Sequence, residues 1–245
     1  MHTLTAVAYA HVVLTWGRNL NGSDLARAKQ LRGAIAQAFL EDDRFHQHDG
    51  PGEQLFYRYP LIQYRWQQGQ GVISAWSEAT DTILNVSWLN LPLRLGEDQV
   101  QVDDALITVK QAHFGISERL LHYRLLTPAL IFNQNNINQY RHLGAAAQQS
   151  ERERLLVAQL LRSLKGLQVN FPVTLYAAFT QTQFSSCPYK GRNLVGISGE
   201  FVSNALLPCS SCEVCSTVCS VCARISSKVV TRSSIKGMVC HPEYE

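Results

Sequence analysis

The chain has 245 residues, of which 46% are apolar and 17% are charged, and its formal net charge is +3. This composition is ample for a hydrophobic core and fits one large or two small domains. The mild positive charge permits an anionic partner without requiring one. No apolar run approaches the roughly 18 residues that span a bilayer, and the N-terminus lacks the basic leader of a signal peptide. We therefore expect a cytoplasmic protein with no membrane partner.

The first half of the chain predicts six elements in a familiar order. The alternating segment "LTAVAYAHVVLTW" predicts a half-buried strand whose inward face runs from Leu4 to Leu14. Ser23 is a good N-cap for a helix that runs from Leu25 to Phe39. The segments "YPLIQYRW" and "GVISAW" predict a hairpin, and a short helix and the strand "DALITVKQAHF" follow. The resulting β-α-β-β-α-β order is typical of a ferredoxin-like domain.

The second half repeats the pattern less clearly. We predict strands in "HYRLLTPALIF", "NFPVTLYAAF" and "NLVGISGEFVSN", the last with Gly196 and Gly199 at a bulge or a close approach. Helices are expected in "NNINQYRHL" and "SERERLLVAQLLRSL", where Ser150 and Glu153 form a capping box. The prediction is an α+β fold with two tandem, RRM-like ferredoxin domains, the second one incomplete at its C-terminus.

The order of the predicted elements and a change in composition place the expected domain boundaries. The first domain is predicted at residues 1–113 and the second at 114–207. At Pro208 an ordinary globular sequence changes to one rich in Ser, Cys and Val. We interpret residues 208–245 as a tail that is disordered or that results from a shifted reading frame.

Several segments resemble one family when they are taken together and in order. They are "LRGAIAQAFLED", "HQH", "YRYPLIQY", "FGISERLLHYRLLTPALIFNQNN", "LLRSLKGLQV" and "LVGISGEFVSN". This series resembles a family of CRISPR-associated endoribonucleases, the b-type branch of the sixth Cas family within the RAMP superfamily. The resemblance implies binding of CRISPR repeat RNA and one cut per repeat in the precursor crRNA, with no metal or cofactor. It also makes an effector complex and a second copy of the chain candidate partners.

The segment "RFHQHDGPGEQLFYRYP" carries side chains suited to that chemistry. In metal-free cleavage the 2′-hydroxyl of the RNA attacks the adjacent phosphate, so a base and an acid must move protons near neutral pH. Histidine suits either role, and the resemblance implies that His48 or His46 is catalytic. The resemblance also implies a tyrosine shortly downstream. We choose Tyr57, because Tyr59 alternates with Leu61 and Gln63 on the expected packed face. Without the resemblance, the two histidines would more often be solvated loop residues.

Cationic side chains are predicted to contact RNA phosphates, which fix the register of the RNA without specifying sequence. The candidates are Arg27, Lys29, Arg32, Arg44, Arg58, Lys190 and Arg192. The alternative is that they are ordinary surface charges of a soluble protein.

The tail departs from the family and carries its own motif. Where the family would continue into a glycine-rich loop, Cys209, Cys212, Cys215 and Cys219 match the spacing of a bacterial ferredoxin cluster. The proline expected after the last of these is Ser220, and no second cluster run exists. Three functions therefore stay open: a repeat-cleaving endoribonuclease, a non-catalytic relative that binds repeat RNA, and an iron–sulfur or zinc protein.

Overall fold

The structure is a computed structural model that describes residues 4–45, 59–189 and 192–208. The chain divides into two compact units. The N-terminal unit consists of Thr5–His113 and Arg162–Val169, and the C-terminal unit consists of Met1–Leu4, Phe114–Leu161 and Asn170–Glu245. Strand β6, which runs without interruption over Asp104–Ala129, contributes to both units.

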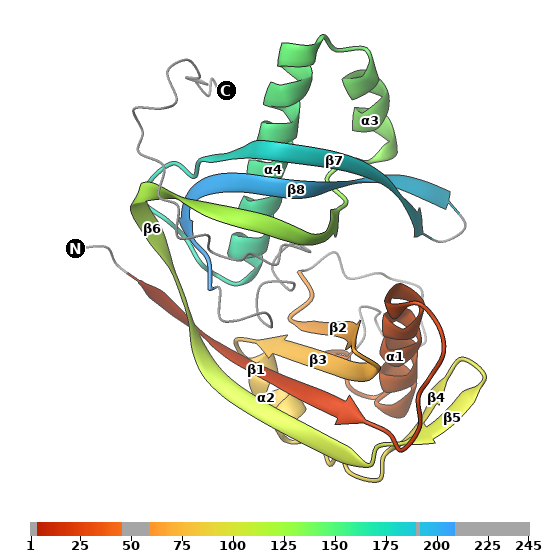
Figure 1. The fold of residues 1–245 in the computed structure, drawn as a ribbon. Helices are drawn as coiled ribbons and strands as arrows, with labels where there is room; N and C mark the ends of the chain where they lie inside the picture. Colours follow the sequence, from red (N-terminus) through yellow and green to blue (C-terminus); the bar gives the residue numbers. More distant parts are fainter. Residues whose placement is uncertain (1–3, 46–58, 190–191, 209–245) are drawn as a thin grey trace. The chain divides into compact units, whose positions relative to one another are not determined.

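The N-terminal unit has the ferredoxin-like arrangement that the sequence predicts (Figure 1). Its elements are β1 (Thr5–Thr15), α1 (Asp24–Ala38), β2 (Ile62–Gln67), β3 (Gln70–Trp76), α2 (Ala79–Leu84), β4 (Pro92–Leu95), β5 (Asp98–Gln101) and the first part of β6. The strand order β2-β3-β1-β6 puts β3 between β1 and β2, and β3 is antiparallel to both. This is the split βαβ motif. The α+β fold class is confirmed.

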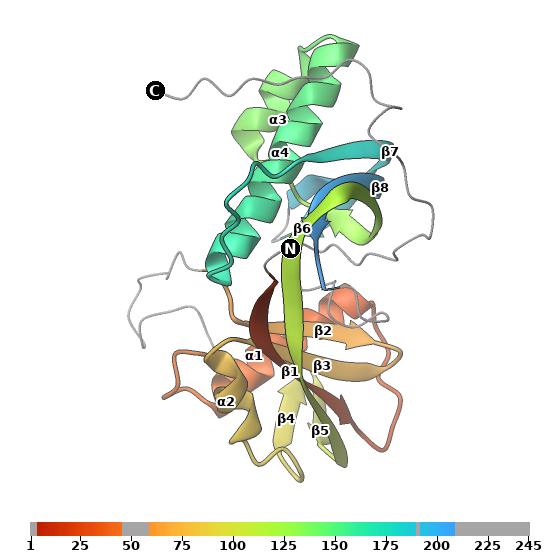
Figure 2. The same cartoon turned by 90° about the vertical axis from the view of Figure 1, so that its left-hand side faces the viewer.

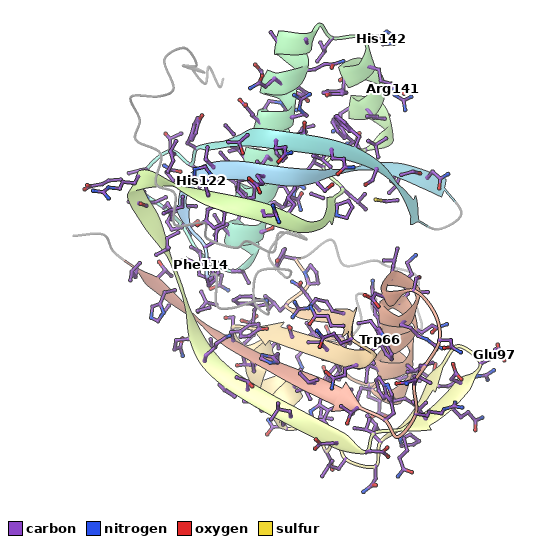
Figure 3. The ribbon with its side chains drawn as sticks, viewed as in Figure 1. Trp66, Glu97, Phe114, His122, Arg141 and His142 are labelled. Carbon is purple, nitrogen blue, oxygen red and sulfur yellow. The ribbon has the colours of Figure 1, made fainter. Side chains whose placement is uncertain are left out.

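Helix α1 begins where its sequence signal places it. The Ser23 hydroxyl accepts a hydrogen bond from the backbone N–H of Ala26 at 3.3 Å, so it satisfies one of the first free donors of the helix. Leu31 and Ile35 lie on the buried side of α1 and have no exposed surface. They pack on a cluster that includes Val12, Leu14 and Trp66, and Figure 3 shows Trp66 on β2.

Strand β1 is buried on both faces, so the prediction of a half-buried strand was wrong. Ala10, Val12 and Leu14 face the helices as expected, but Tyr9 and His11 on the opposite face are also buried. Ala6, assigned to the inward face, is exposed instead. Alternation of apolar residues therefore identified the strand and only one of its buried faces.

The hairpin formed by β4 and β5 was not predicted. Its two strands are joined at Gly96, whose positive φ of 70° favours glycine. The sequence "LPLRLGEDQV" does carry the signal, because alternating leucines precede a turn that contains Gly. Figure 2 shows this hairpin as a small separate sheet of the N-terminal unit.

The C-terminal unit repeats the split motif within the residues described. Its elements are the second part of β6, α3 (Gln134–Arg141), α4 (Ala145–Gly166, which ends in the N-terminal unit), β7 (Ala177–Tyr189) and β8 (Arg192–Leu206). The strand order β6-β8-β7 is again antiparallel. The predicted strand "HYRLLTPALIF" is the continuation of β6, which shifts register on either side of the segment Leu121–Leu125.

Two further local predictions for this unit were wrong. Ser150 lies inside α4, where its hydroxyl donates to the carbonyl oxygen of Ala146 at 3.3 Å, so it caps nothing. The capping box belongs to α3, where Asn133 and Asn136 exchange side-chain and backbone hydrogen bonds. The strand expected from Phe171 begins only at Ala177. Just before it, the Asn204 side chain accepts from the Tyr176 N–H at 2.7 Å and donates to the carbonyl oxygen of Thr174 at 3.0 Å.

The prediction for the glycines of β8 is confirmed. Gly199 has a φ of +134°, and a Cβ there would collide with the backbone of Gln181. Strand β7 changes register between Phe179 and Gln181, at the same level of the sheet. Gly196 also approaches its neighbours closely, since an added Cβ would lie 2.7 Å from the Cys187 Sγ atom. Only a residue without a side chain fits these two positions.

Candidate active site

The candidate catalytic residues His46, His48 and Tyr57 lie outside the residues that the structure describes, as does Arg58. They belong to the connection between α1 and β2, in the N-terminal unit. The described residues on either side show how the two ends of this connection are held.

The entry to the connection is fixed at Phe45. Its ring is 3% exposed and stacks on Phe39 with a centroid distance of 4.7 Å. The Tyr64 hydroxyl of β2 donates to the carbonyl oxygen of Phe45 at 2.9 Å. Burial raises the pKa of Tyr64, and the nearby charge of Arg32 opposes this rise only in part. Tyr64 therefore stays protonated and available as a donor.

The exit from the connection is held at Tyr59. Gly166, at the end of α4, lies so close that an added Cβ would collide with the Tyr59 side chain. Gln63 donates a hydrogen bond from its side chain to the Tyr59 hydroxyl at 3.2 Å. The glycine of "LLRSLKGLQV" therefore has a packing role, because only a residue without Cβ lets α4 approach the start of β2 this closely.

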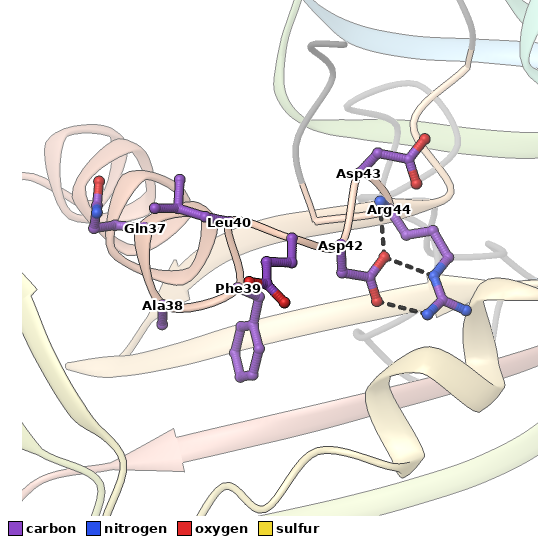
Figure 4. Close-up of a pocket in the computed structure, with 8 residues that line it drawn as sticks. Gln37, Ala38, Phe39, Leu40, Asp42, Asp43 and Arg44 are labelled. Carbon is purple, nitrogen blue, oxygen red and sulfur yellow. Dashed lines mark hydrogen bonds and ion pairs between the residues drawn. The ribbon is translucent and has the colours of Figure 1, made fainter. Parts of the chain in front are cut away.

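A surface hollow of about 740 Å³, lined by residues Gln37–Arg44, lies beside the entry (Figure 4). It contains the carboxylates of Glu41, Asp42 and Asp43 and a single guanidinium, that of Arg44. Arg44 makes a two-pronged contact with Asp42, at 2.7 Å from Nε and 2.6 Å from Nη2. This contact raises the pKa of Arg44. The hollow is thus acidic, and a phosphate would have to compete with Asp42 for Arg44.

The other cationic candidates differ in their surroundings. Arg27 is only 6% exposed, and its guanidinium donates to Asn21, Gln30, Leu95 and Asp98. These bonds give it a structural role, and we leave it out of the proposed RNA contacts. Lys29 and Arg32 are exposed on α1. Lys190 and the side chain of Arg192 lie outside the described residues.

A polar cluster on β1, β2 and β3 was missed by the sequence analysis. The Tyr9 hydroxyl lies 3.2 Å from the Ser74 Oγ atom, and the Arg65 guanidinium donates to the same Oγ at 2.8 Å. The ring of His11 lies 5.7 Å from the Tyr9 ring, over which Lys110 is placed. Tyr9 and His11 occupy the odd positions of an alternating strand, which was the available signal.

The candidate metal ligands Cys209, Cys212, Cys215 and Cys219 also lie outside the described residues. Within the ranges described, no group of three or more His, Cys, Asp or Glu side chains is placed to hold a metal ion. No described helix is long and apolar enough to cross a membrane.

The fold and the site define the chain as an α+β protein built on ferredoxin-like split motifs, with a candidate histidine loop between its first helix and second strand. A family model of the Cas6b N-terminal domain matches residues 9–113, and a model of the Cas6b C-terminal domain matches residues 115–211. The chain belongs to the Cas6b family.

Individual proteins are also similar to this chain. An uncharacterized protein of Methanocaldococcus jannaschii is 29% identical over 128 residues, which are 52% of this chain and 84% of the relative. A crystal structure of Cas6b covers 87% of this chain and 96% of its own, with 20% identity and a TM-score of 0.70. A structure titled as the CRISPR RNA processing endoribonuclease Cas6b matches over 83% of this chain and 90% of its own, with 20% identity and a TM-score of 0.60. At this identity the two structures support the fold.

Proposed function

We propose that this protein is an endoribonuclease that processes CRISPR RNA by cutting it within each repeat. The observation that carries the proposal is the tandem match to both domains of the Cas6b family over residues 9–113 and 115–211. The connection that holds His46 and His48 lies inside the first match. The solved relative titled as an endoribonuclease shares the fold over 83% of this chain.

The proposed reaction needs no metal. A base removes the proton of the 2′-hydroxyl, and the freed oxygen attacks the adjacent phosphorus. The bond from phosphorus to the 5′-oxygen breaks, and an acid protonates the leaving oxygen. The products are a 2′,3′-cyclic phosphate and a 5′-hydroxyl. We assign the acid or base role to His48, with His46 as the alternative, and the orienting hydroxyl to Tyr57.

Cationic side chains are proposed to contact the phosphates of the bound RNA, which fixes the register of the RNA. Lys29 and Arg32 are exposed on α1 and stay in the proposal. Arg44 stays in it on the condition that RNA displaces Asp42. Arg58, Lys190 and Arg192 complete the proposed set. We extend the proposal to two partners: an effector complex that receives the cut RNA, and a second copy of the chain. Size-exclusion chromatography with and without RNA would test whether two copies associate.

The first experiment measures single-turnover cleavage of a repeat RNA from the host genome. We expect His48→Ala to slow cleavage by about 100-fold or more, because general acid–base catalysis contributes at least that much. The affinity for RNA should change little. His142→Ala is a matched control, because this exposed histidine follows α3 in the other unit (Figure 3). If the His48→Ala protein cuts as fast as its parent, the assignment passes to His46.

The second experiment tests the absence of metal. Cleavage should continue in EDTA and stop when one 2′-deoxynucleotide occupies the cut site, because that RNA lacks the nucleophile. Loss of cleavage in EDTA would favour metal-assisted hydrolysis and direct attention to the cysteines. A parent protein that binds the repeat RNA but leaves it intact would instead be a non-catalytic repeat-binding relative.

A further inference from the structure

An aromatic cluster in the C-terminal unit presents one ring to solvent. Phe132 and Tyr140 are each 6% exposed, and their ring centroids lie 4.8 Å apart. The Phe184 ring of β7 lies 6.2 Å from the Tyr140 ring and 6.5 Å from that of Phe132, yet it is 46% exposed. Two buried rings therefore hold an exposed ring in a fixed orientation.

Exposure alone does not make Phe184 a binding residue, because soluble proteins often expose single apolar side chains. Its place in the fold adds more. Strand β7 is an edge of the sheet, so Phe184 lies at the border of the core and not within it. Figure 1 shows α3, which carries Tyr140, on the same side of β7 as α4. A rim position of this kind leaves one face of the ring open.

A cation next to the same cluster provides an independent observation. The guanidinium carbon of Arg152 lies 6.0 Å from the centre of the Tyr140 ring, and its Nη1 donates to the Tyr140 hydroxyl at 2.5 Å. The Nε atom of Arg152 is buried and has no acceptor. Among the described residues no carboxylate forms an ion pair with Arg152. By contrast, Arg154 donates to Glu151 through two atoms, each at 2.7 Å.

A partly buried cation without a counter-charge is unfavourable for the free protein, because desolvation is not offset by an opposite charge. An anion that joins Arg152 on binding would remove this cost. The Tyr140 ring has Arg152 and Phe184 as direct neighbours, so an anionic group and a flat ring can be bound close together. A nucleotide combines the two, with a negative phosphate and a base that stacks on aromatic rings.

We propose that Phe184 and Arg152 bind one unpaired nucleotide of the repeat RNA, with its base on the open face of Phe184 and its phosphate at Arg152. This inference rests on the proposed function, which supplies the RNA. The site lies wholly in the C-terminal unit, and it binds substrate without taking part in the chemistry. Stacking tolerates any base, so the site contributes affinity more than sequence readout.

The stacking half of the proposal is tested by equilibrium binding of the repeat RNA. Phe184→Leu keeps an apolar side chain and removes the ring, so we expect the Kd to rise by about tenfold or more. Phe184→Tyr should bind like the parent. Val173→Ala is the matched control, because Val173 is 50% exposed in the same unit and lies outside the cluster. Cleavage at saturating RNA should be equal in the parent and in Val173→Ala.

A second readout separates stacking from a structural effect. Repeat RNAs carrying 2-aminopurine at successive unpaired positions report stacking as a loss of fluorescence. One position should be quenched by the parent and by Phe184→Tyr, and should stay bright with Phe184→Leu. Thermal unfolding of the free proteins should be alike. If Phe184→Leu binds and quenches like its parent, or loses RNA only because it unfolds, the ring has no role in RNA binding.

The phosphate half is tested by the salt dependence of binding. Each phosphate contact to single-stranded nucleic acid contributes about 0.7 to the slope of log K against log salt concentration. Arg152→Gln should lower the slope by about this amount, and Arg152→Lys should restore much of it. Arg154→Gln removes the same charge from the same helix, but Arg154 is paired with Glu151. The salt slope of Arg154→Gln should therefore differ less from that of the parent than the slope of Arg152→Gln does. Equal slopes for the parent and Arg152→Gln would refute the contact.

The parent protein separates this inference from the function on which it rests. If the parent neither binds nor cuts repeat RNA, the proposed function fails and this site fails with it. If the parent binds and cuts, but the Phe184 and Arg152 variants match it, only this inference fails. Capture of a peptide instead of RNA by the cluster would also overturn it.

Discussion

At the scale of single residues, Tyr64 joins the core of the N-terminal unit to the entry of the candidate catalytic loop. Its hydroxyl donates to the Phe45 carbonyl oxygen, and burial raises its pKa. The unfolded chain releases this proton near pH 10, the usual value for tyrosine, while the folded protein keeps it. Stability from Tyr64 is therefore fully present below about pH 10 and is lost as the pH rises beyond it.

We expect Tyr64→Phe to lower the free energy of unfolding by about 1 kcal/mol near neutral pH, the net value of one hydrogen bond. Above about pH 10 the difference between the two proteins should shrink, because only the parent has this group to ionise on unfolding. Urea titrations followed by tryptophan fluorescence at a series of pH values would measure it. A difference that stays constant into the alkaline range would mean that Tyr64 ionises alike in both states.

At the scale of elements, Arg27 connects α1 to the β4–β5 hairpin. Its guanidinium binds Asp98 at 2.7 Å and the carbonyl oxygen of Leu95 at 3.2 Å, and it also bonds Asn21 before the helix. The side chain of Arg27 is 7% exposed and that of Asp98 is 31% exposed, so Arg27 makes these bonds largely out of contact with water. Arg18 binds the other oxygen of Asp98, but its side chain is 56% exposed.

We therefore predict unequal effects for two substitutions that remove the same charge. Arg27→Met should lower the free energy of unfolding by about 2–3 kcal/mol, because a largely buried guanidinium with several hydrogen bonds is lost and the buried Leu95 carbonyl oxygen loses its donor. Arg18→Met should cost less than about 1 kcal/mol, as for other exposed ion pairs. Urea denaturation provides both values. Equal effects would show that Arg27 contributes no more to stability than a surface charge does. Arg27 would then return to the set of proposed RNA contacts.

At the scale of the whole molecule, the described part of the C-terminal unit is tied down at its last residues. Leu207 is 1% exposed, and its N–H donates to the Tyr123 hydroxyl at 3.2 Å. Tyr123 in turn donates to the carbonyl oxygen of Ala205 at 2.7 Å. These two bonds hold the C-terminal end of β8 and Leu207 against Tyr123 of β6.

A chain that ends at Pro208 should keep its fold and its affinity for RNA almost unchanged. The removed segment has few large apolar side chains among its Ser, Thr and charged residues, so burial could offset little of the entropy of ordering it. Thermal unfolding, RNA binding and metal analysis of the full and shortened chains would test this. A shortened chain that fails to fold, or that loses bound iron or zinc, would make the tail a metal module.

The sequence alone determined the features that depend on near neighbours. The alternation in β1, the Ser23 cap of α1 and the β2–β3 hairpin follow from residues a few positions apart, and their order predicts the ferredoxin-like fold. The segments that resemble the family also lie along the chain in order. The roles of the candidate histidines remain a prediction, because His46 and His48 lie outside the described residues.

Tertiary structure decided what depends on residues that are distant in sequence. Arg27 is a structural residue because Asp98, 71 positions later, comes to its guanidinium. Gly166 is required because Tyr59 lies against it, and Phe184 becomes a candidate base platform only beside Phe132 and Tyr140. Local patterns record which side of an element is apolar, but they do not record which partner meets it. Burial and charge pairing are set by that partner, and only the folded chain brings it near.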